Sequence, residues 1–95
     1  MTERPLESEL ERKGNGFAEL RGWWTCKFTS PGLRGVPDRI YSRVENGRPR
    51  VVFIEWKRPG ETPTKQQLRR HQEMREHGLE VHWVDSYERA CEILQ

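Results

Sequence analysis

The order of hydrophobic and polar positions divides the chain into helical and extended segments. Residues 4–21 carry leucines and Phe17 at spacings of three and four, the period of one helical face. Four segments have the β-branched and aromatic composition of strands, at residues 23–29, 38–44, 50–56 and 79–84. Residues 64–78 and 85–94 return to the helical period. This order, helix, three strands, helix, strand, helix, predicts an α/β fold with a mixed four-stranded sheet flanked by helices.

The second and third extended segments should form an antiparallel hairpin, because the sequence ENG at residues 45–47 is a turn signal. In such a hairpin the start of one strand lies beside the end of the next, so Asp38 should approach Glu55. Side chains alternate along a strand, so Glu55 and Lys57 share one face and Trp56 takes the other. We therefore expect two carboxylates and one ammonium at the same edge of the sheet.

The first helix offers further carboxylates. Glu7 and Glu11 are four residues apart beside the apolar stripe, so they should face whatever that stripe packs on. Solubilising glutamates in the first turns of a helix would give the same pattern. Gly14 and Gly16 each weaken a helix interior by roughly 1 kcal/mol relative to alanine, so we expect the helix to kink or break between them.

Composition indicates a small domain with a limited core. The 95 residues fit one domain, and 33% hydrophobic content with a mean hydropathy of -1.02 leaves little to bury, so subunit association could add buried surface. The net charge of +2 says little, but basic residues gather around residues 51–59. They are Arg48, Arg50, Lys57, Arg58, Lys65, Arg69, Arg70 and Arg75. This cluster favours a polyanionic partner, although a solvated basic face remains an alternative.

Several classes of site and location are disfavoured. Cys26 and Cys91 match no zinc or redox spacing, and His71, His77 and His82 have no metal-ligand spacing. There is no nucleophile elbow or Gly-rich phosphate loop, so we expect no organic cofactor. The chain begins with charged residues and has no long apolar window, which predicts a cytoplasmic protein without a membrane span.

The expected carboxylate pair is suited to metal-dependent hydrolysis of a phosphodiester. Asp38 and Glu55 supply hard oxygen ligands, which suit Mg2+, with Mn2+ as a substitute. The metal would lower the pKa of water and neutralise developing charge, and Lys57 could orient the water or stabilise that charge. A plain ion pair between Glu55 and Lys57 at a strand end is the alternative interpretation.

The order of the motifs resembles a known nuclease family. GVPD at residues 35–38, then a hairpin, then IEWK at residues 54–57 is similar to the PD-(D/E)xK nuclease superfamily. The runs ELERK, KFTSPGLRGVPDR, FIEWKRPGETPTKQQ and GLEVHWVDS together resemble the stand-alone VRR-NUC (virus-type replication-repair nuclease) domain of phages and bacteria. The resemblance covers about residues 7–94 and implies a restriction-endonuclease-like core.

This resemblance implies roles for individual residues. Asp38 and Glu55 match the metal-binding carboxylates, with the backbone carbonyl of Trp56 facing the metal, and Lys57 matches the catalytic lysine. Further catalytic positions implied by the resemblance are Glu11, with Glu7 as the alternate helical ligand, and Gln67. The side chains expected to contact DNA are Lys27, Arg34, Arg39, Arg58 and Lys65.

The resemblance also implies a substrate and an assembly. Similar stand-alone domains resolve four-way (Holliday) junctions, so we expect a branched DNA substrate. We expect the protein to act in the cytoplasm of a bacterial host cell. A two-fold symmetric junction calls for two active sites, which a homodimer supplies. The alternatives from other classes are a module that binds branched DNA without cutting it and a small interaction domain.

Overall fold

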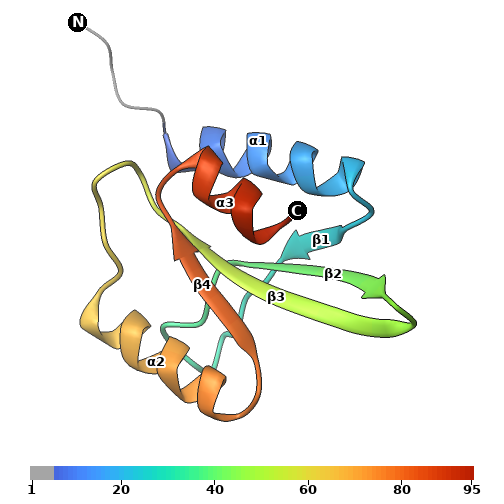
Figure 1. Cartoon of the computed structure of the whole chain (residues 1–95). Coiled ribbons are helices and arrows are strands. Elements are labelled where there is room, and N and C mark those ends of the chain that lie inside the picture. The colour runs from blue at the N-terminus through green and yellow to red at the C-terminus, as the bar shows by residue number, and fades with distance from the viewer. Residues whose placement is uncertain (1–5) are drawn as a thin grey trace, which may run out of the picture.

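The computed structural model of the chain describes residues 6–95, and its elements follow the predicted order (Figure 1). The elements are α1 (Glu7–Leu20), β1 (Trp24–Lys27), β2 (Arg39–Glu45), β3 (Arg48–Trp56), α2 (Lys65–Glu76), β4 (Glu80–Val84) and α3 (Tyr87–Ile93). The predicted α/β class is confirmed. The first predicted strand is shortened to four residues, and the predicted start of the first helix at residue 4 lies outside the described residues.

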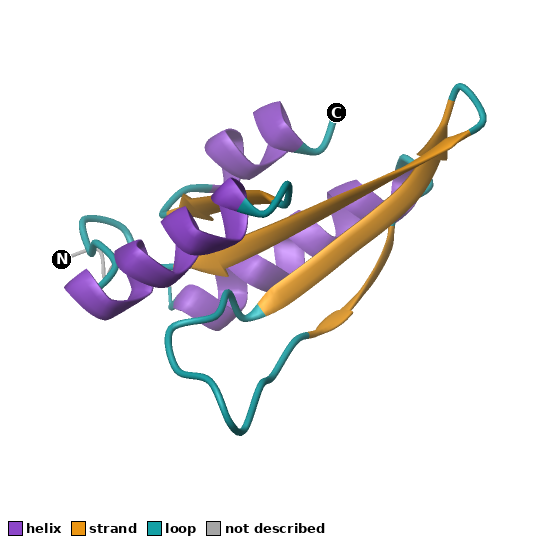
Figure 2. Cartoon of the chain, turned by 90° about the horizontal axis from the view of Figure 1, so that it is seen from below, coloured by secondary structure: helices purple, strands orange, loops and turns teal. Residues whose placement is uncertain are grey.

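The four strands form one mixed sheet in the order β1-β2-β3-β4. β1, β2 and β3 pair antiparallel, whereas β4 pairs parallel to β3. A parallel neighbour requires a crossover connection, which α2 supplies. Helices α1 and α3 cover one face of the sheet, and α2 lies on the other face beside β4 (Figures 1 and 2). The predicted mixed sheet flanked by helices is therefore confirmed.

The core lies between the sheet and the α1–α3 layer. Alternate residues of β3 point into it, as the strand pattern predicts, and Val52, Ile54 and Trp56 are fully buried. Tyr41 from β2 joins them, where its hydroxyl accepts a hydrogen bond from Trp56 Nε1 (3.0 Å). The same hydroxyl donates to Asn15 Oδ1 of α1 at 2.6 Å. These two hydrogen bonds tie α1 to β2 and β3 next to Glu55 and Lys57.

Helix α1 runs without a break from Glu7 to Leu20, so the predicted kink between Gly14 and Gly16 is wrong. The physical reason lies in packing across the layers. A Cβ atom at Gly14 would lie 2.4 Å from Cη2 of the Trp56 indole, whereas nothing lies within 4 Å of the same position at Gly16. Gly14 therefore allows a close approach of helix and indole, and this packing offsets the weak helix propensity of glycine.

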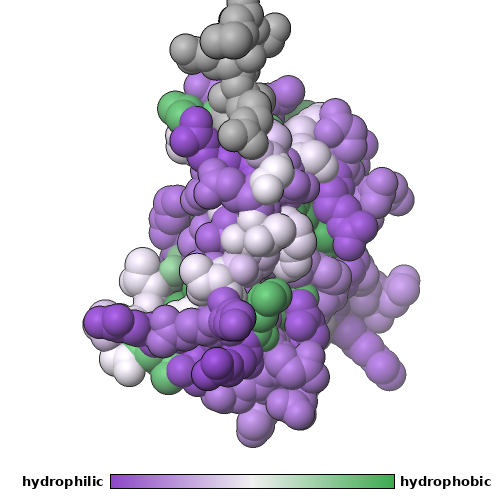
Figure 3. All heavy atoms as spheres, turned by 90° about the vertical axis from the view of Figure 1, so that its left-hand side faces the viewer, coloured by the Kyte–Doolittle hydropathy of each residue, from purple (hydrophilic) through white to green (hydrophobic). Residues whose placement is uncertain are grey.

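The surface is mostly polar. Figure 3 views the side of the molecule that carries the loop between β3 and α2, and it shows a mainly hydrophilic face with small apolar areas. Among residues 6–95, no helix combines the length and apolar character that crossing a membrane requires.

Candidate active site

The hairpin brings Asp38 and Glu55 together at one end of the sheet. Arg39 pairs with Ile54, so the residue before β2 and the residue after Ile54 meet where the hairpin opens. The backbone N–H of Trp56 donates to Asp38 Oδ2 at 3.4 Å. Asp38 Oδ1 and Glu55 Oε1 are buried, and neither has a hydrogen-bond partner within the described residues. Two carboxylates thus converge with one oxygen each left unsatisfied.

The surroundings of this pair disfavour ionisation of both groups. Burial raises the pKa of Asp38, and the negative charge of Glu11 raises it further. Burial also raises the pKa of Glu55, and the charge of Asp38 adds to the effect, while Lys57 opposes it. Two adjacent carboxylates of this kind are stabilised either by a shared proton or by a cation that replaces it.

The donor set fits a divalent metal with a preference for hard oxygen ligands, because it consists of two converging carboxylates with unsatisfied oxygens. Within residues 6–95, no three His, Cys, Asp or Glu side chains gather closely enough to hold a metal by themselves. Backbone carbonyls, water or a substrate phosphate would therefore complete the coordination. Mg2+ commonly binds proteins in this way, through one or two carboxylates.

Lys57 lies beside Glu55 but forms no hydrogen bond with its carboxylate. Its Nζ is 3.9 Å from Glu55 Oε2, at the outer limit for an ion pair, and its side chain is 15% exposed. The Lys57 backbone N–H donates to Val84 O at 2.8 Å, which continues the contact between β3 and β4 by one residue and fixes where the side chain begins. The long distance, together with the orphaned Glu55 Oε1, argues against a simple structural ion pair.

His71 of α2 is a neighbour of the site that the sequence did not reveal. Its side chain is fully buried, and its Nε2 lies 4.0 Å from Glu55 Oε1. Both ring nitrogens lack a hydrogen-bond partner in the described part of the chain. Burial lowers the pKa of His71 to about 4, helped by the positive charges of Arg75 and Lys57, so the ring is neutral at neutral pH. The available signal was its spacing of three residues from both Leu68 and Met74, which places His71 on an apolar stripe of α2.

Glu11 is engaged by cations. It is 5% exposed, and its carboxylate accepts from Lys27 Nζ at 2.9 Å and from Arg39 Nη1 at 3.0 Å. Arg39 also donates to Thr25 Oγ1. Two side chains expected to contact DNA, Lys27 and Arg39, therefore hold a buried carboxylate of α1.

Glu7 is placed differently. Burial and nearer groups have larger effects on the pKa values of Asp38 and Glu55, and the negative charge of Glu7 raises both pKa values further. Glu11 contributes in this way to Asp38. Within the described residues, Glu7 has no ion pair of the kind that neutralises Glu11, so the two carboxylates of α1 differ in their availability to a cation.

The side chain of Gln67 caps the start of α2 instead of reaching toward the carboxylates. Its Oε1 accepts from the backbone N–H of Thr64 at 2.9 Å, and its own N–H donates to Thr64 Oγ1 at 3.1 Å. This reciprocal pair is a capping box, which a threonine three residues before a glutamine signals in sequence. No hydrogen bond joins Gln67 to Asp38 or Glu55 within residues 6–95.

The remaining basic side chains expected to contact DNA surround this end of the molecule. Arg34 is exposed in the loop before β2, and its carbonyl accepts from Arg70 Nε of α2 at 2.9 Å. The next residue, Gly35, has a φ of +83° and passes so close to α2 that a Cβ there would lie 2.9 Å from Gln66 O. The loop before β2 is thus held against α2 a few residues before Asp38.

Two further cations lie between β3 and α2. Arg58 is exposed and lies 3.8 Å from Glu61, and Lys65 is exposed at the first position of α2. An exposed pair of this kind contributes little to stability, so Arg58 is available to an incoming phosphate. Lys65 is available as well, because it forms no ion pair within residues 6–95.

The chain is similar to known proteins in sequence and in fold. No family model matches the chain. Over 84 residues, which cover 88% of this chain and 78% of the relative, it is 44% identical to "Putative nuclease p44" of Acyrthosiphon pisum secondary endosymbiont phage 1. A solved structure described as a VRR_NUC domain superposes with a TM-score of 0.78 at 25% sequence identity, covering 92% of this chain and 91% of that one.

Proposed function

Because the chain belongs to the VRR-NUC nuclease family and has its restriction-endonuclease-like fold, we propose that it is a Mg2+-dependent, structure-selective DNA endonuclease that cleaves four-way junctions as a homodimer. The observation that carries the proposal is the pair of Asp38 and Glu55, each with one buried oxygen that has no hydrogen-bond partner within the described residues, beside Lys57. A phosphodiester of DNA is the substrate that such a pair, a divalent cation and a lysine can hydrolyse.

Asp38 and Glu55 would hold the cation, with the backbone carbonyl of Trp56 and a carboxylate of α1 as further ligands. Of the α1 carboxylates, Glu7 is the better candidate, because Lys27 and Arg39 already neutralise Glu11. When bound, Mg2+ supplies charge neutralisation at the phosphate and lowers the pKa of water, and Mn2+ should substitute.

Lys57 supplies positive charge at the same point. Its ammonium lies on the Glu55 side of the pair, held there by the backbone bond to Val84. A scissile phosphate at the carboxylates would therefore meet Lys57, which stabilises the negative charge that builds on the phosphate oxygens. His71, neutral and buried, closes the site on the α2 side without competing for the phosphate.

An exposed apolar area supports the proposed homodimer. Trp24 is 61% exposed and Val44 is 72% exposed, and both lie on the sheet face opposite α1. Because α2 packs on β4, it leaves this part of the sheet uncovered (Figure 2). Exposed apolar area on a small domain commonly marks an interface. A second copy bound there would supply the second active site that a junction with two-fold symmetry requires. The dimer would act in the cytoplasm of a bacterial cell.

The test is a cleavage panel of four-way junctions, flaps, nicked duplex and linear duplex with Mg2+. The wild type should cut the junction, and Lys57→Ala should lower the rate at least about a hundredfold, as loss of a group that stabilises transition-state charge does. Arg12→Ala removes an exposed arginine of α1 and should leave the rate unchanged. If no substrate is cut, or Lys57→Ala cuts like the wild type, the proposed activity is wrong.

Metal binding and assembly are measured separately. Titration calorimetry with Mn2+ should show binding that Asp38→Asn abolishes. Light scattering should give the mass of a dimer, and Trp24→Asp should give that of a monomer. Junction binding without cutting, unaffected by Asp38→Asn, would instead support a module that recognises branched DNA without cleaving it.

A further inference from the structure

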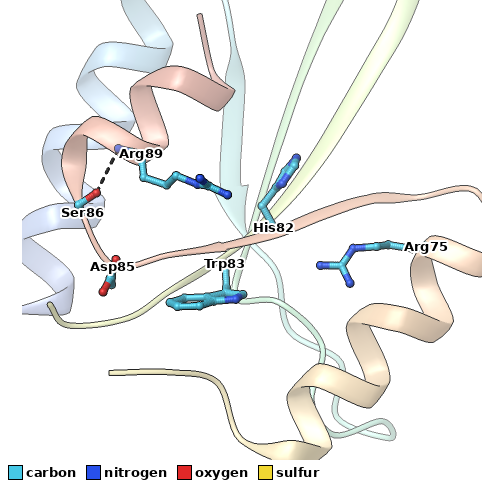
Figure 4. Close-up of a pocket in the computed structure, with 6 residues that line it drawn as sticks. All are labelled: Arg75, His82, Trp83, Asp85, Ser86 and Arg89. Carbon is cyan, nitrogen blue, oxygen red and sulfur yellow. Dashed lines mark hydrogen bonds between the residues drawn. The ribbon is translucent and has the colours of Figure 1, made fainter. Parts of the chain in front are cut away.

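A hollow of about 440 Å³ lies at the outer edge of β4, between α2 and α3 (Figure 4). The residues that line this β4 hollow are Arg75, His82, Trp83, Asp85, Ser86 and Arg89. Arg75 belongs to the basic cluster seen in the sequence, but none of the six is among the side chains expected to contact DNA. The volume lies in the range of pockets that hold small organic ligands, which is roughly 300–1,000 Å³.

The charge of the β4 hollow suits an anion. Arg75 of α2 and Arg89 of α3 extend over β4 from opposite sides of it (Figure 4). Arg75 uses its Nε to donate to Val81 O at 3.0 Å, which leaves its terminal nitrogens for a ligand. Within residues 6–95, the Arg89 guanidinium makes no hydrogen bond or ion pair. Asp85 is the one carboxylate in the lining, and it already accepts from the Gly60 N–H at 3.1 Å.

Trp83 adds an aromatic face to these cations. Its indole borders the β4 hollow and is half-buried (Figure 4). Arginines provide bonds to phosphate, and an indole provides a surface on which any base can stack. The combination suits a nucleotide, because a free inorganic anion or a simple aliphatic carboxylate would leave the indole unused.

The β4 hollow adjoins the carboxylate pair. Trp83 pairs with Glu55 across β3 and β4, so the two side chains lie on the same sheet face in neighbouring strands. Asp85 holds Gly60 in the loop that follows Lys57. A strand of DNA that leaves the carboxylates can therefore pass over this loop and enter the β4 hollow.

We propose that the β4 hollow binds one nucleotide of an unpaired DNA strand, with Arg75 and Arg89 on a phosphate and Trp83 stacked on the base. The inference rests on the proposed function, because it identifies the unpaired strand as part of the substrate of the same site. A base in a duplex is already stacked on its neighbours and is not free to occupy the hollow. The site thus selects branched or frayed DNA over continuous duplex.

The test uses an oligothymidylate of about ten nucleotides, with binding followed by fluorescence anisotropy in EDTA so that no cleavage is involved. Arg89→Gln should weaken binding roughly tenfold. It should also reduce the slope of log K against log salt by about 0.7, the value for one lost phosphate contact on a single strand. Arg12→Gln changes charge equally on α1, outside the hollow, and should leave both quantities nearly unchanged.

Trp83→Leu separates stacking from charge. It should weaken binding of the oligothymidylate roughly tenfold while the salt slope stays that of the wild type. The proposal is overturned if Arg89→Gln binds like the wild type, if Arg12→Gln weakens binding equally, or if Trp83→Leu, folded by circular dichroism, binds unchanged. These outcomes do not depend on cleavage, so a protein that cuts junctions and fails this test refutes the nucleotide site alone.

Discussion

Gly14 is the point at which α1 crosses the Trp56 indole. Replacing it with alanine improves the helix propensity of α1 but crowds the packing against the indole. In a helix interior, Gly→Ala contributes roughly 1 kcal/mol of stability. At Gly14 the new Cβ would lie 2.4 Å from Cη2 and 2.7 Å from Cζ2 of Trp56. The indole is fully buried and bonded to the Tyr41 hydroxyl, so it cannot swing away.

The resulting magnitude follows from two opposing contributions. Overpacking of a core costs typically 1–3 kcal/mol, and a contact this short belongs near the upper end, at about 3 kcal/mol. Gly14→Ala should therefore destabilise the protein by about 2 kcal/mol. Gly16→Ala, two residues along the same helix with nothing within 4 Å, should stabilise it by about 1 kcal/mol. The two variants differ in the environment of the added methyl group.

Thermal and urea unfolding measure both effects, at about 4–8 °C of melting temperature per kcal/mol for a domain of this size. In a Trp56→Phe background, the ring atoms nearest Gly14 are absent, so Gly14→Ala should cost less than in the wild type. Because Trp56 joins Glu55 to Lys57, we also expect Gly14→Ala to lower the cleavage rate. Equal stabilisation by Gly14→Ala and Gly16→Ala would refute the close packing of helix and indole.

Three further predictions concern the carboxylates and the buried hydrogen bonds. Burial and neighbouring charges raise the pKa of Asp38 and Glu55, so folded, metal-free protein resists their ionisation. Its melting temperature in EDTA should therefore fall as the pH rises from about 6.5 to about 8, where Glu55 still titrates in the folded protein and His71 is largely neutral whether the chain is folded or unfolded, and Glu55→Gln should flatten that fall. Glu11→Gln should lower the free energy of unfolding in urea by about 2 kcal/mol, because Lys27 and Arg39 lose the carboxylate that they bind. Glu7→Gln should leave the free energy of unfolding unchanged and weaken Mn2+ binding in calorimetry. Tyr41→Phe should cost about 2 kcal/mol in the same unfolding assay, since it leaves the buried Trp56 Nε1 without a partner and removes the bond to Asn15 Oδ1; an unchanged midpoint would contradict that role.

The sequence by itself determined the order of the elements and the meeting of Asp38 with Glu55. Both follow from local signals, the alternation of side chains along a strand and a turn at residues 45–47, which act over a few residues and need no knowledge of the rest of the fold. The side on which Trp56 lies was determined in the same way, because the strand period is two.

Only the tertiary structure decided which partner each side chain of the site meets. Glu11 binds Lys27 and Arg39, and His71 closes on Glu55, because helices from distant parts of the sequence pack on the two faces of the sheet. The uninterrupted course of α1 through Gly14 depends on the size of a side chain in β3. These outcomes are set by distances between elements, which depend on how layers pack and on the volume of the residues between them. Periodicity along the chain carries no information about those distances.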